Sequence, residues 1–261
     1  MKTSAVLRSS REGVVEMMMN QTLSKLTAMR LSAMGEEFRR QMELPAMAGL
    51  PFEERFGLMV EAEWRERYNK ISRLLKAAKL RCPSACLEDI DFASERKLDK
   101  ALVARLSDMS WLKECRNLFI TGACGVGKTW IASAFGNAAC RLEKRVASYR
   151  VTRLLDSLRT ARADGTWGKL LVMLKKPELL ILDDFGLDSL DATHCRDLLE
   201  IMEDRYGYGS VLITAQLPVA EWHSVFEDAT VADATLDRLV HNSYRIELHG
   251  PSRRARANKN Q

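Results

Sequence analysis

The stretch Asn117-Leu-Phe-Ile-Thr-Gly-Ala-Cys-Gly-Val-Gly-Lys-Thr129 decides the fold of this chain. It contains Gly122-x-x-x-x-Gly127-Lys128-Thr129, the full pattern of a phosphate-binding loop. An apolar segment precedes the loop and a helical pattern follows it, as the motif requires. Glycines let backbone N–H groups turn toward phosphate oxygens, and the helix that follows adds the positive end of its dipole. The stretch therefore predicts a nucleotide site between a strand and a helix.

The residues of the loop have separate expected roles. Lys128 is expected to reach the β- and γ-phosphates, and the hydroxyl of Thr129 to bind Mg²⁺. The residues expected to contact the nucleotide are Gly122, Ala123, Cys124, Gly125, Val126, Gly127, Lys128, Thr129 and Trp130. The motif thus predicts ATP and Mg²⁺ as cofactors.

Two further segments end in polar residues suited to the same site. In Leu179-Leu-Ile-Leu-Asp-Asp184, four apolar residues lead into two acids, which places the acids at the carboxyl end of a buried strand. Asp183 is expected to hold Mg²⁺, and Asp184 to orient and deprotonate an attacking water. A third segment, Val211 to Gln216, ends in a polar group that can position this water. We expect Gln216 to do so, with Thr214 as the alternative.

The sequence around these motifs alternates between strand and helix patterns. Short apolar runs predict strands at 117–121, 146–151, 178–183, 210–215 and 244–248. Helical patterns lie between them, notably at 129–143, 152–163 and 193–206. This alternation predicts an α/β fold with a parallel five-stranded sheet covered on both faces.

The N-terminal part has a different, wholly helical pattern. One apolar stripe consists of Leu23, Leu26, Met34, Phe38 and Met42, and a second of Phe56, Val60, Trp64, Tyr68, Ile71, Leu75 and Ala78. We expect both stripes to pack against other helices, and Pro83 to follow the end of the second helix. The predicted domains are a flexible tail at 1–16, a helical domain at 17–82 for binding DNA or a partner, the nucleotide-binding domain at 83–250, and a basic tail at 251–261.

Composition excludes several other classes of protein. The chain has 261 residues and a mean hydropathy of −0.21, and no apolar run approaches the roughly 18 residues of a membrane-spanning helix. The first residues lack the apolar core of a secretory signal. The six cysteines are scattered, which favours free thiols in a reducing cytoplasm over a disulfide framework or a zinc site.

The distribution of charge indicates a polyanionic partner. Formal net charge is only +5, but residues 65–81 contain seven basic residues against one acid. Candidates for contact with DNA in this cluster are Arg65, Arg67, Lys70, Arg73 and Lys76. The chain shows no base-reading motif such as a zinc finger, so we expect contacts to the backbone of duplex DNA with low sequence specificity.

Four segments together resemble a known family. They are GACGVGKT (122–129), LLILDDFG (179–186), ITAQLPVAEWH (213–223) and ADATLDRLVHNSYRIELHGPSRR (232–254). The chain resembles, over roughly residues 17–256, the IstB-like ATP-binding proteins, which are transposition helpers of bacterial insertion sequences. These proteins belong to the AAA+ class and are close to DnaC-type helicase loaders. The resemblance implies an AAA+ ATPase of the bacterial cytoplasm and nucleoid that forms a homo-oligomer on DNA and assists a transposase in target selection.

The resemblance also implies roles for single residues. Arg238 falls where such proteins present an arginine to the γ-phosphate of the neighbouring subunit. Arg254 falls near a second sensing arginine close to the C-terminus, and Arg253 is the alternative for that position. The implied catalytic set is therefore Lys128, Asp184, Gln216, Arg238 and Arg254. Asp184 departs from the glutamate that many AAA+ proteins have there, which shortens the base by one methylene. The basic region 141–176 falls where related proteins carry a helical insertion facing nucleic acid, with Arg153, Arg159, Arg162 and Lys169 as candidates.

Two other functions share the phosphate-binding loop. A helicase loader would have the same core but bind a replicative helicase through its N-terminal domain. A small-molecule kinase would use the loop without any need for DNA. For Arg238, an ordinary intrachain ion pair is the alternative to a role at a neighbouring subunit.

Overall fold

The computed structural model describes residues 16–253, apart from the side chain of Ser94. Its sheet has the strand order β2-β3-β4-β1-β5, and every pairing is parallel. The strands are β1 (Asn117–Gly122), β2 (Val146–Arg150), β3 (Leu179–Phe185), β4 (Ser210–Ala215) and β5 (Ser243–Leu248). The predicted parallel five-stranded sheet is confirmed, with each strand close to its expected range.

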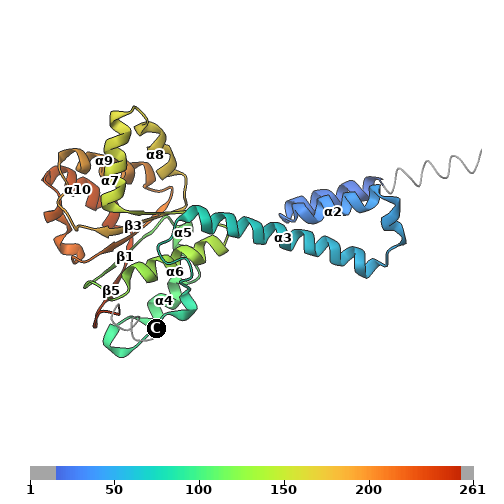
Figure 1. Ribbon diagram of the computed structural model, residues 1–261, viewed down its shortest axis with the longest axis horizontal. Coiled ribbons are helices and arrows are strands. Elements are labelled where there is room, and N and C mark those ends of the chain that lie inside the picture. The colour runs from blue at the N-terminus through green and yellow to red at the C-terminus, as the bar shows by residue number, and fades with distance from the viewer. Residues whose placement is uncertain (1–15, 254–261) are drawn as a thin grey trace, which may run out of the picture. The chain divides into compact units, whose positions relative to one another are not determined.

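Helices cover both faces of this sheet (Figure 1). One core lies against α4 (Lys100–Leu106), α5 (Ser110–Lys113) and α6 (Lys128–Arg141). The other lies against α7 (Val151–Ala163), α8 (Trp167–Lys175), α9 (Ala192–Arg205) and α10 (Ala229–Val240). Short 3₁₀ turns occupy η2 (Leu87–Asp89), η3 (Ser94–Arg96) and η4 (Val219–Val225). The three central strands, β1, β3 and β4, are thus almost wholly buried, which is why they are largely apolar runs.

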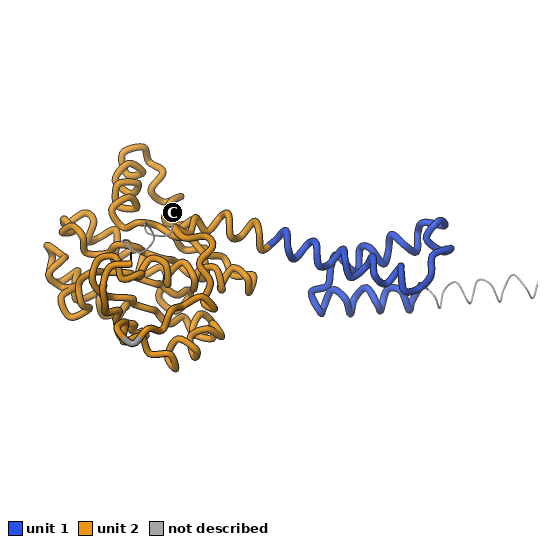
Figure 2. Tube along the Cα trace, turned by 60° about the horizontal axis from the view of Figure 1, so that its bottom comes forward, with its two compact units in different colours: residues 1–70 blue, residues 71–261 orange. Residues whose placement is uncertain are grey.

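The chain divides into two compact units, residues 1–70 and 71–261 (Figure 2). The described part of the first unit contains a helix over residues 16–28, α2 (Ser32–Glu43), η1 (Pro45–Gly49) and most of α3 (Phe52–Ala78). The division falls inside α3, whereas the predicted boundary at residue 82 follows the end of that helix. The last turns of α3 belong to the second unit, where Ala78 is fully buried in the core.

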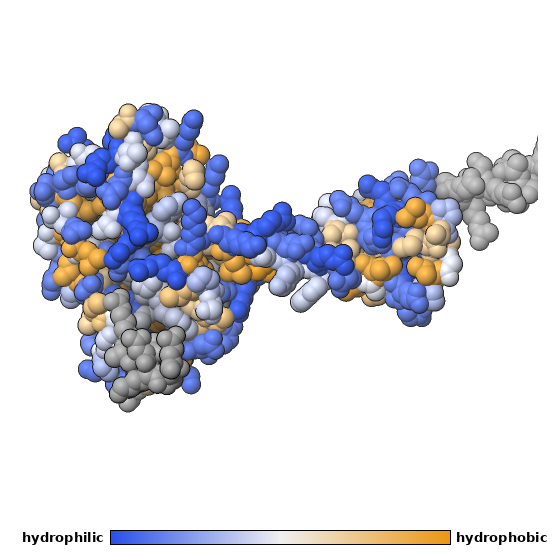
Figure 3. Space-filling model, in the orientation of Figure 1, coloured by the Kyte–Doolittle hydropathy of each residue, from blue (hydrophilic) through white to orange (hydrophobic). Residues whose placement is uncertain are grey.

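The apolar stripe of α3 corrects one expectation. Its N-terminal members do not pack as predicted, since Phe56 and Val60 are exposed and Trp64 and Tyr68 retain 67% and 66% of their accessible surface. Hydrophobic side chains are accordingly visible on the surface of the first unit among hydrophilic ones (Figure 3). Trp64 and Tyr68 follow Glu63, whose side chain contacts α2, by one and five positions, so they lie about 100° and 140° around α3 from that contact.

Glu63 fixes this packing through polar contacts. Its Oε2 accepts hydrogen bonds from the backbone N–H groups of Ala33 and Met34, at 3.1 and 3.2 Å. The carboxylate thereby satisfies two N–H groups that the first turn of α2 leaves without helical partners.

In the described part of the chain, no helix is both long and apolar enough to cross a membrane.

Candidate nucleotide-binding site

The phosphate-binding loop connects β1 to α6 and depends on glycine backbone conformations. Gly122, Gly125 and Gly127 have φ of +141°, +82° and +99°. A Cβ atom on Gly122 would lie 2.2 Å from the carbonyl oxygen of Leu248, so no other residue fits there without movement of β5. Lys128 is almost buried, and its Nζ donates to the carbonyl oxygens of Gly122 and Ala123 at 2.7 and 2.8 Å. The ammonium group therefore lies across the loop that would cradle phosphates.

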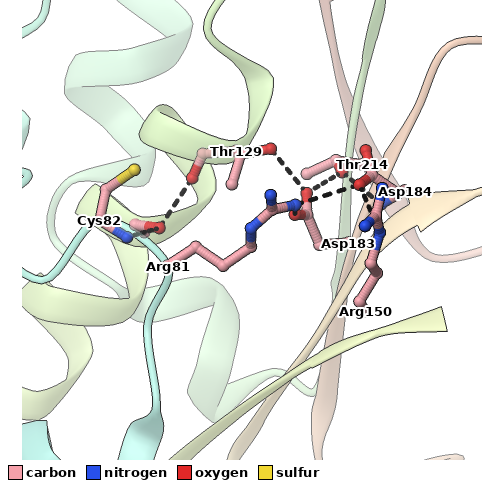
Figure 4. Close-up of polar contacts among 8 residues, drawn as sticks. Arg81, Cys82, Thr129, Arg150, Asp183, Asp184 and Thr214 are labelled. Carbon is pink, nitrogen blue, oxygen red and sulfur yellow. Dashed lines mark hydrogen bonds and ion pairs between the residues drawn. The ribbon is translucent and has the colours of Figure 1, made fainter. Parts of the chain in front are cut away.

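Asp183 connects the loop to the neighbouring strands. Thr129 Oγ1, in the first turn of α6, donates to Asp183 Oδ1 at 2.9 Å, and Thr214 Oγ1 donates to the same oxygen (Figure 4). Asp183 is 1% exposed, and it lies at the carboxyl end of β3 as predicted. Hydroxyl and carboxylate oxygens are the ligands that Mg²⁺ prefers, so the neighbouring side chains of Thr129 and Asp183 fit the expected metal.

An irregularity in the sheet brings both acids to the same point. Leu182 pairs with Ile213 but Phe185 pairs with Ala215, so β3 has one more residue than β4 over this interval. The extra residue is accommodated as a bulge, with Asp184 in the left-handed region at φ +62°.

Thr214 is the residue of β4 that faces this bulge. Its Oγ1 accepts the backbone N–H of Asp184 at 3.0 Å while it donates to Asp183. Gln216, the residue expected to position the water, is exposed and lies beyond the end of β4. The structure therefore brings the alternative, Thr214, to the acids.

Two arginines that sequence reasoning did not assign to this site contact the acids. Arg81 Nη1 lies 2.7 Å from Asp183 Oδ2 and 3.1 Å from Asp184 Oδ2, and Arg150 Nε lies 3.0 Å from Asp184 Oδ2 (Figure 4). Arg81 had been counted with the basic cluster of residues 65–81. No local pattern could identify it, because its partners lie more than 100 positions away.

The other side of the loop is supported by a buried arginine. Arg96 donates through Nη2 to the carbonyl oxygen of Val126 at 3.0 Å and through Nη1 to that of Asp91 at 2.7 Å. Burial lowers the pKa of the Arg96 guanidinium. Its position behind the loop was also not predicted.

The C-terminal segment lies against the same loop. The backbone N–H of Arg253 donates to the carbonyl oxygen of Gly125 at 2.9 Å, and the Arg253 guanidinium pairs with Asp91. That pairing lowers the pKa of Asp91. Arg254, the predicted sensing arginine, lies outside the described residues.

Comparison with known proteins identifies the family. The family model described as "IstB-like ATP binding protein" matches residues 24–261. The chain belongs to this family. It is 46% identical over 239 residues to the insertion-sequence ATP-binding protein y4pL of Sinorhizobium fredii, covering 91% of this chain and 97% of that protein. It is 45% identical over 204 residues to the ATP-binding protein of insertion sequence IS1162 from Pseudomonas fluorescens, covering 77% and 88%.

Solved structures support the AAA+ P-loop fold of this IstB-like protein. A crystal structure of DnaI has a TM-score of 0.55 at 21% identity and covers 69% of this chain and 92% of that one. AMPPCP-bound DnaA from Aquifex aeolicus has a TM-score of 0.55 at 20% identity and covers 70% and 55%. At such identities the likeness extends to the fold alone.

Arg238 of the IstB-like chain lies far from its own phosphate-binding loop. The carbonyl oxygen of the next residue, Leu239, accepts a hydrogen bond from the side chain of Asn117, the first residue of β1. The loop begins at the other end of this six-residue strand, which spans roughly 17 Å. Arg238 Nη2 forms an intrachain ion pair with Glu203 Oε1 at 2.7 Å.

The candidate DNA-contacting residues of the IstB-like chain are spread over both units. All five on α3 are exposed, and so are Arg153, Arg159 and Lys169 on α7 and α8. Arg162 has a structural partner: its Nε lies 3.0 Å from Oδ1 of the fully buried Asp197, and its guanidinium stacks on Trp167. The hydrogen bond to Asp197 raises the pKa of Arg162. Arg162 therefore neutralises a buried carboxylate, in addition to any contact with DNA.

Proposed function

We propose that this IstB-like protein is a cytoplasmic, nucleoid-associated AAA+ ATPase that oligomerises on duplex DNA and assists a transposase in selecting its target. The observation that carries the ATPase proposal is the Thr129–Asp183 contact, because it joins the phosphate-binding loop to the acid pair of β3. The insertion-sequence context of the relatives supports a transposase as partner.

The residues of the site divide the chemistry among them. Thr129 and Asp183 would hold Mg²⁺, which supplies positive charge to the phosphates when bound. Lys128 neutralises phosphate charge, and Asp184 orients and deprotonates the attacking water. Thr214 holds Asp183 and the backbone of Asp184, so it positions the acids for this reaction.

Hydrolysis measured with and without DNA tests the proposal. A DNA-assembling ATPase should hydrolyse ATP faster when duplex DNA is present and should form larger species on DNA when ATP is bound. A small-molecule kinase would respond to neither. Equal hydrolysis rates with and without duplex DNA, together with a monomer in all conditions, would exclude the proposed function.

The basic face of α3 should make DNA affinity strongly dependent on salt. Replacing Arg65, Arg67 and Lys70 together by alanine should weaken binding to unrelated duplexes by similar factors. It should also reduce the slope of log K against log salt by roughly 2–3, because about 0.9 counterions are released per phosphate contact. Fluorescence anisotropy at several salt concentrations measures both quantities.

A matched control removes the same charge from the other helices of the first unit. The triple variant of Lys25, Arg39 and Arg40 loses three exposed basic residues and should keep the wild-type slope. An equal fall in slope for both triple variants would mean that net charge, and not the α3 face, determines DNA binding.

Substitutions of Thr214 and Gln216 should lower the rate of ATP hydrolysis to different extents. Thr214→Val preserves shape but removes the hydroxyl that Asp183 and Asp184 share, so steady-state ATP hydrolysis should fall about 10-fold or more. Gln216→Ala should reduce it less, because this side chain is exposed beyond the strand. A larger loss for Gln216→Ala would restore Gln216 as the residue that positions the water.

A helicase loader remains the second candidate function. The observation in its favour is the fold likeness to a structure described as the DnaC helicase loader, with a TM-score of 0.53 at 18% identity. Pull-down with the transposase of the same insertion sequence, and separately with a replicative helicase, distinguishes the two. A transposase gene directly upstream would also favour the first function.

A further inference from the structure

Arg81 occupies a position that neither the sequence motifs nor the proposed chemistry explains. It lies three residues beyond the end of α3, after Lys79 in the left-handed region at φ +51° and the buried Leu80. This turn directs its side chain to the acid pair, where one nitrogen, Nη1, contacts both Asp183 Oδ2 and Asp184 Oδ2 (Figure 4).

The backbone of this segment is attached to the helix that carries the metal-binding hydroxyl. The N–H of Cys82 donates to Ser133 Oγ at 3.3 Å, and Ser133 Oγ donates to the carbonyl oxygen of Thr129 at 2.8 Å. Arg81 is therefore held beside the first turn of α6 (Figure 4). Its reach to the acids is a property of the second unit alone and does not depend on how the first unit is placed.

Asp183 needs a cation because its side chain is only 2% exposed. Its Oδ1 accepts two hydroxyl groups, which are neutral, while Oδ2 accepts the guanidinium of Arg81. A buried carboxylate without a counter-charge is strongly unfavourable. Arg81 thus supplies the positive charge that Mg²⁺ would bring to the same carboxylate.

The two cations compete for one group of oxygens. A divalent ion held by Thr129 and Asp183 would face the Arg81 guanidinium across the same carboxylate, and like charges repel strongly at such separations. Arg81 can leave at little cost, because 44% of its side chain is already exposed to water. Arg150, in contrast, contacts Asp184 and can keep that contact during the exchange.

We propose that Arg81 is the resident counter-cation of the Asp183–Asp184 pair and is displaced from it when magnesium nucleotide binds. This inference rests on the proposed role of Thr129 and Asp183 as magnesium ligands. The segment that follows α3 would then take a direct part in nucleotide binding. Arg81 keeps the two acids ordered before nucleotide binds. It also sets the magnesium concentration at which nucleotide binds.

The test measures binding and not turnover. Arg81→Gln removes the charge while keeping a long polar side chain, and Arg81→Lys keeps the charge. Arg145→Gln is the matched control, since Arg145 pairs with Glu178 just before the start of β3, at the opposite end of that strand from the acids. Binding of a fluorescent ATP analogue is titrated with Mg²⁺, and the melting temperature is measured without metal and nucleotide.

We expect Arg81→Gln to need at least about fivefold less Mg²⁺ for half-maximal nucleotide binding and to melt at a lower temperature without ligands. Arg81→Lys and Arg145→Gln should keep the wild-type magnesium midpoint. Circular dichroism verifies that each variant is folded, and Arg81→Ala, which also removes the charge, takes the place of Arg81→Gln if that variant does not fold, with the same expected and contradicting midpoints.

Two results would overturn the inference. One is a midpoint for Arg81→Gln within twofold of wild type, and the other is weaker magnesium-dependent binding, which would make Arg81 a nucleotide ligand. If the wild-type chain binds ATP with no dependence on Mg²⁺, the proposed magnesium site itself fails. If the wild type does depend on Mg²⁺ and Arg81→Gln has the same magnesium midpoint, only the proposed role of Arg81 fails.

Discussion

Lys128→Ala should bind ATP at least about 100-fold more weakly than the wild type. The Lys128 ammonium lies across the loop at the carbonyl oxygens of Gly122 and Ala123, where it would meet phosphate oxygens when nucleotide enters. A hydrogen bond to a charged group contributes about 1.5–3 kcal/mol, and two of them correspond to a factor of 10² or more in affinity. Isothermal titration with Mg²⁺ and ATP measures the loss directly.

Asp184→Asn should have the opposite profile, with nucleotide affinity largely kept and hydrolysis slowed by about 10²-fold or more. Asparagine has the same shape and tolerates the left-handed backbone that Asp184 adopts at φ +62°, so the bulge in β3 should remain. It cannot accept a proton from water, and loss of a general base costs typically 10²–10⁴-fold in rate. Single-turnover hydrolysis measures this effect separately from binding.

The pair of variants tests the division of roles between loop and acids. Arg145→Gln is a useful control here too, because it removes a charge just before β2, at the end of the sheet opposite the nucleotide site. Equal losses of nucleotide affinity in Lys128→Ala and Asp184→Asn would contradict the assignment of Asp184 to catalysis. Melting temperatures show whether either variant is merely unfolded.

The parts of the site that the sequence predicted are those fixed by local chain geometry. A glycine-rich loop between strand and helix can cradle phosphate in few ways, and acids after a buried apolar run must reach the carboxyl edge of a parallel sheet. Thr129 and Asp183 accordingly lie in contact, although 54 positions separate them. The central strands β1, β3 and β4 were predictable because strands buried on both faces are largely apolar.

The parts that were not predicted depend on tertiary contacts that leave no local pattern. Arg81 looks like any other base of the α3 cluster, yet it pairs with acids more than 100 positions away. Thr214 could be preferred over Gln216 only once the bulge between Leu182 and Phe185 set the register of β3 against β4. The exposure of Trp64 shows the same limit: periodicity identifies a helix face but not the partner that covers it.

Arg238→Ala should bind ATP with nearly wild-type affinity and yet hydrolyse it about 10³-fold more slowly. Arg238 lies near the amino end of β1 and its own loop follows the carboxyl end, so Arg238 cannot contact the nucleotide of its own subunit. We propose that, in an assembly with ATP at the interfaces, Arg238 contacts the γ-phosphate of a neighbour, where an arginine is worth 10³–10⁵ in rate.

The Glu203 ion pair offers a control for this prediction. Both side chains are partly exposed, and exposed pairs contribute only about 0–1 kcal/mol, so Arg238 can exchange Glu203 for a phosphate at small cost. Glu203→Gln should therefore keep hydrolysis at or above the wild-type rate. If Glu203→Gln instead loses as much activity as Arg238→Ala, the pair is structural and the arginine has no role at a neighbouring site.

Mixing two inactive variants decides whether Arg238 acts between subunits. A Lys128→Ala subunit cannot use its own site but still donates Arg238 to the intact site of an Arg238→Ala neighbour. Mixed assemblies should therefore recover part of the wild-type ATPase activity, provided that the Lys128→Ala subunit enters them without nucleotide. Hydrolysis then removes the phosphate that Arg238 contacts, which would loosen the interface and make the ATP-bound oligomer on DNA a transient signal to the transposase. Co-assembly on DNA without any recovery of activity would show that Arg238 does not act in trans.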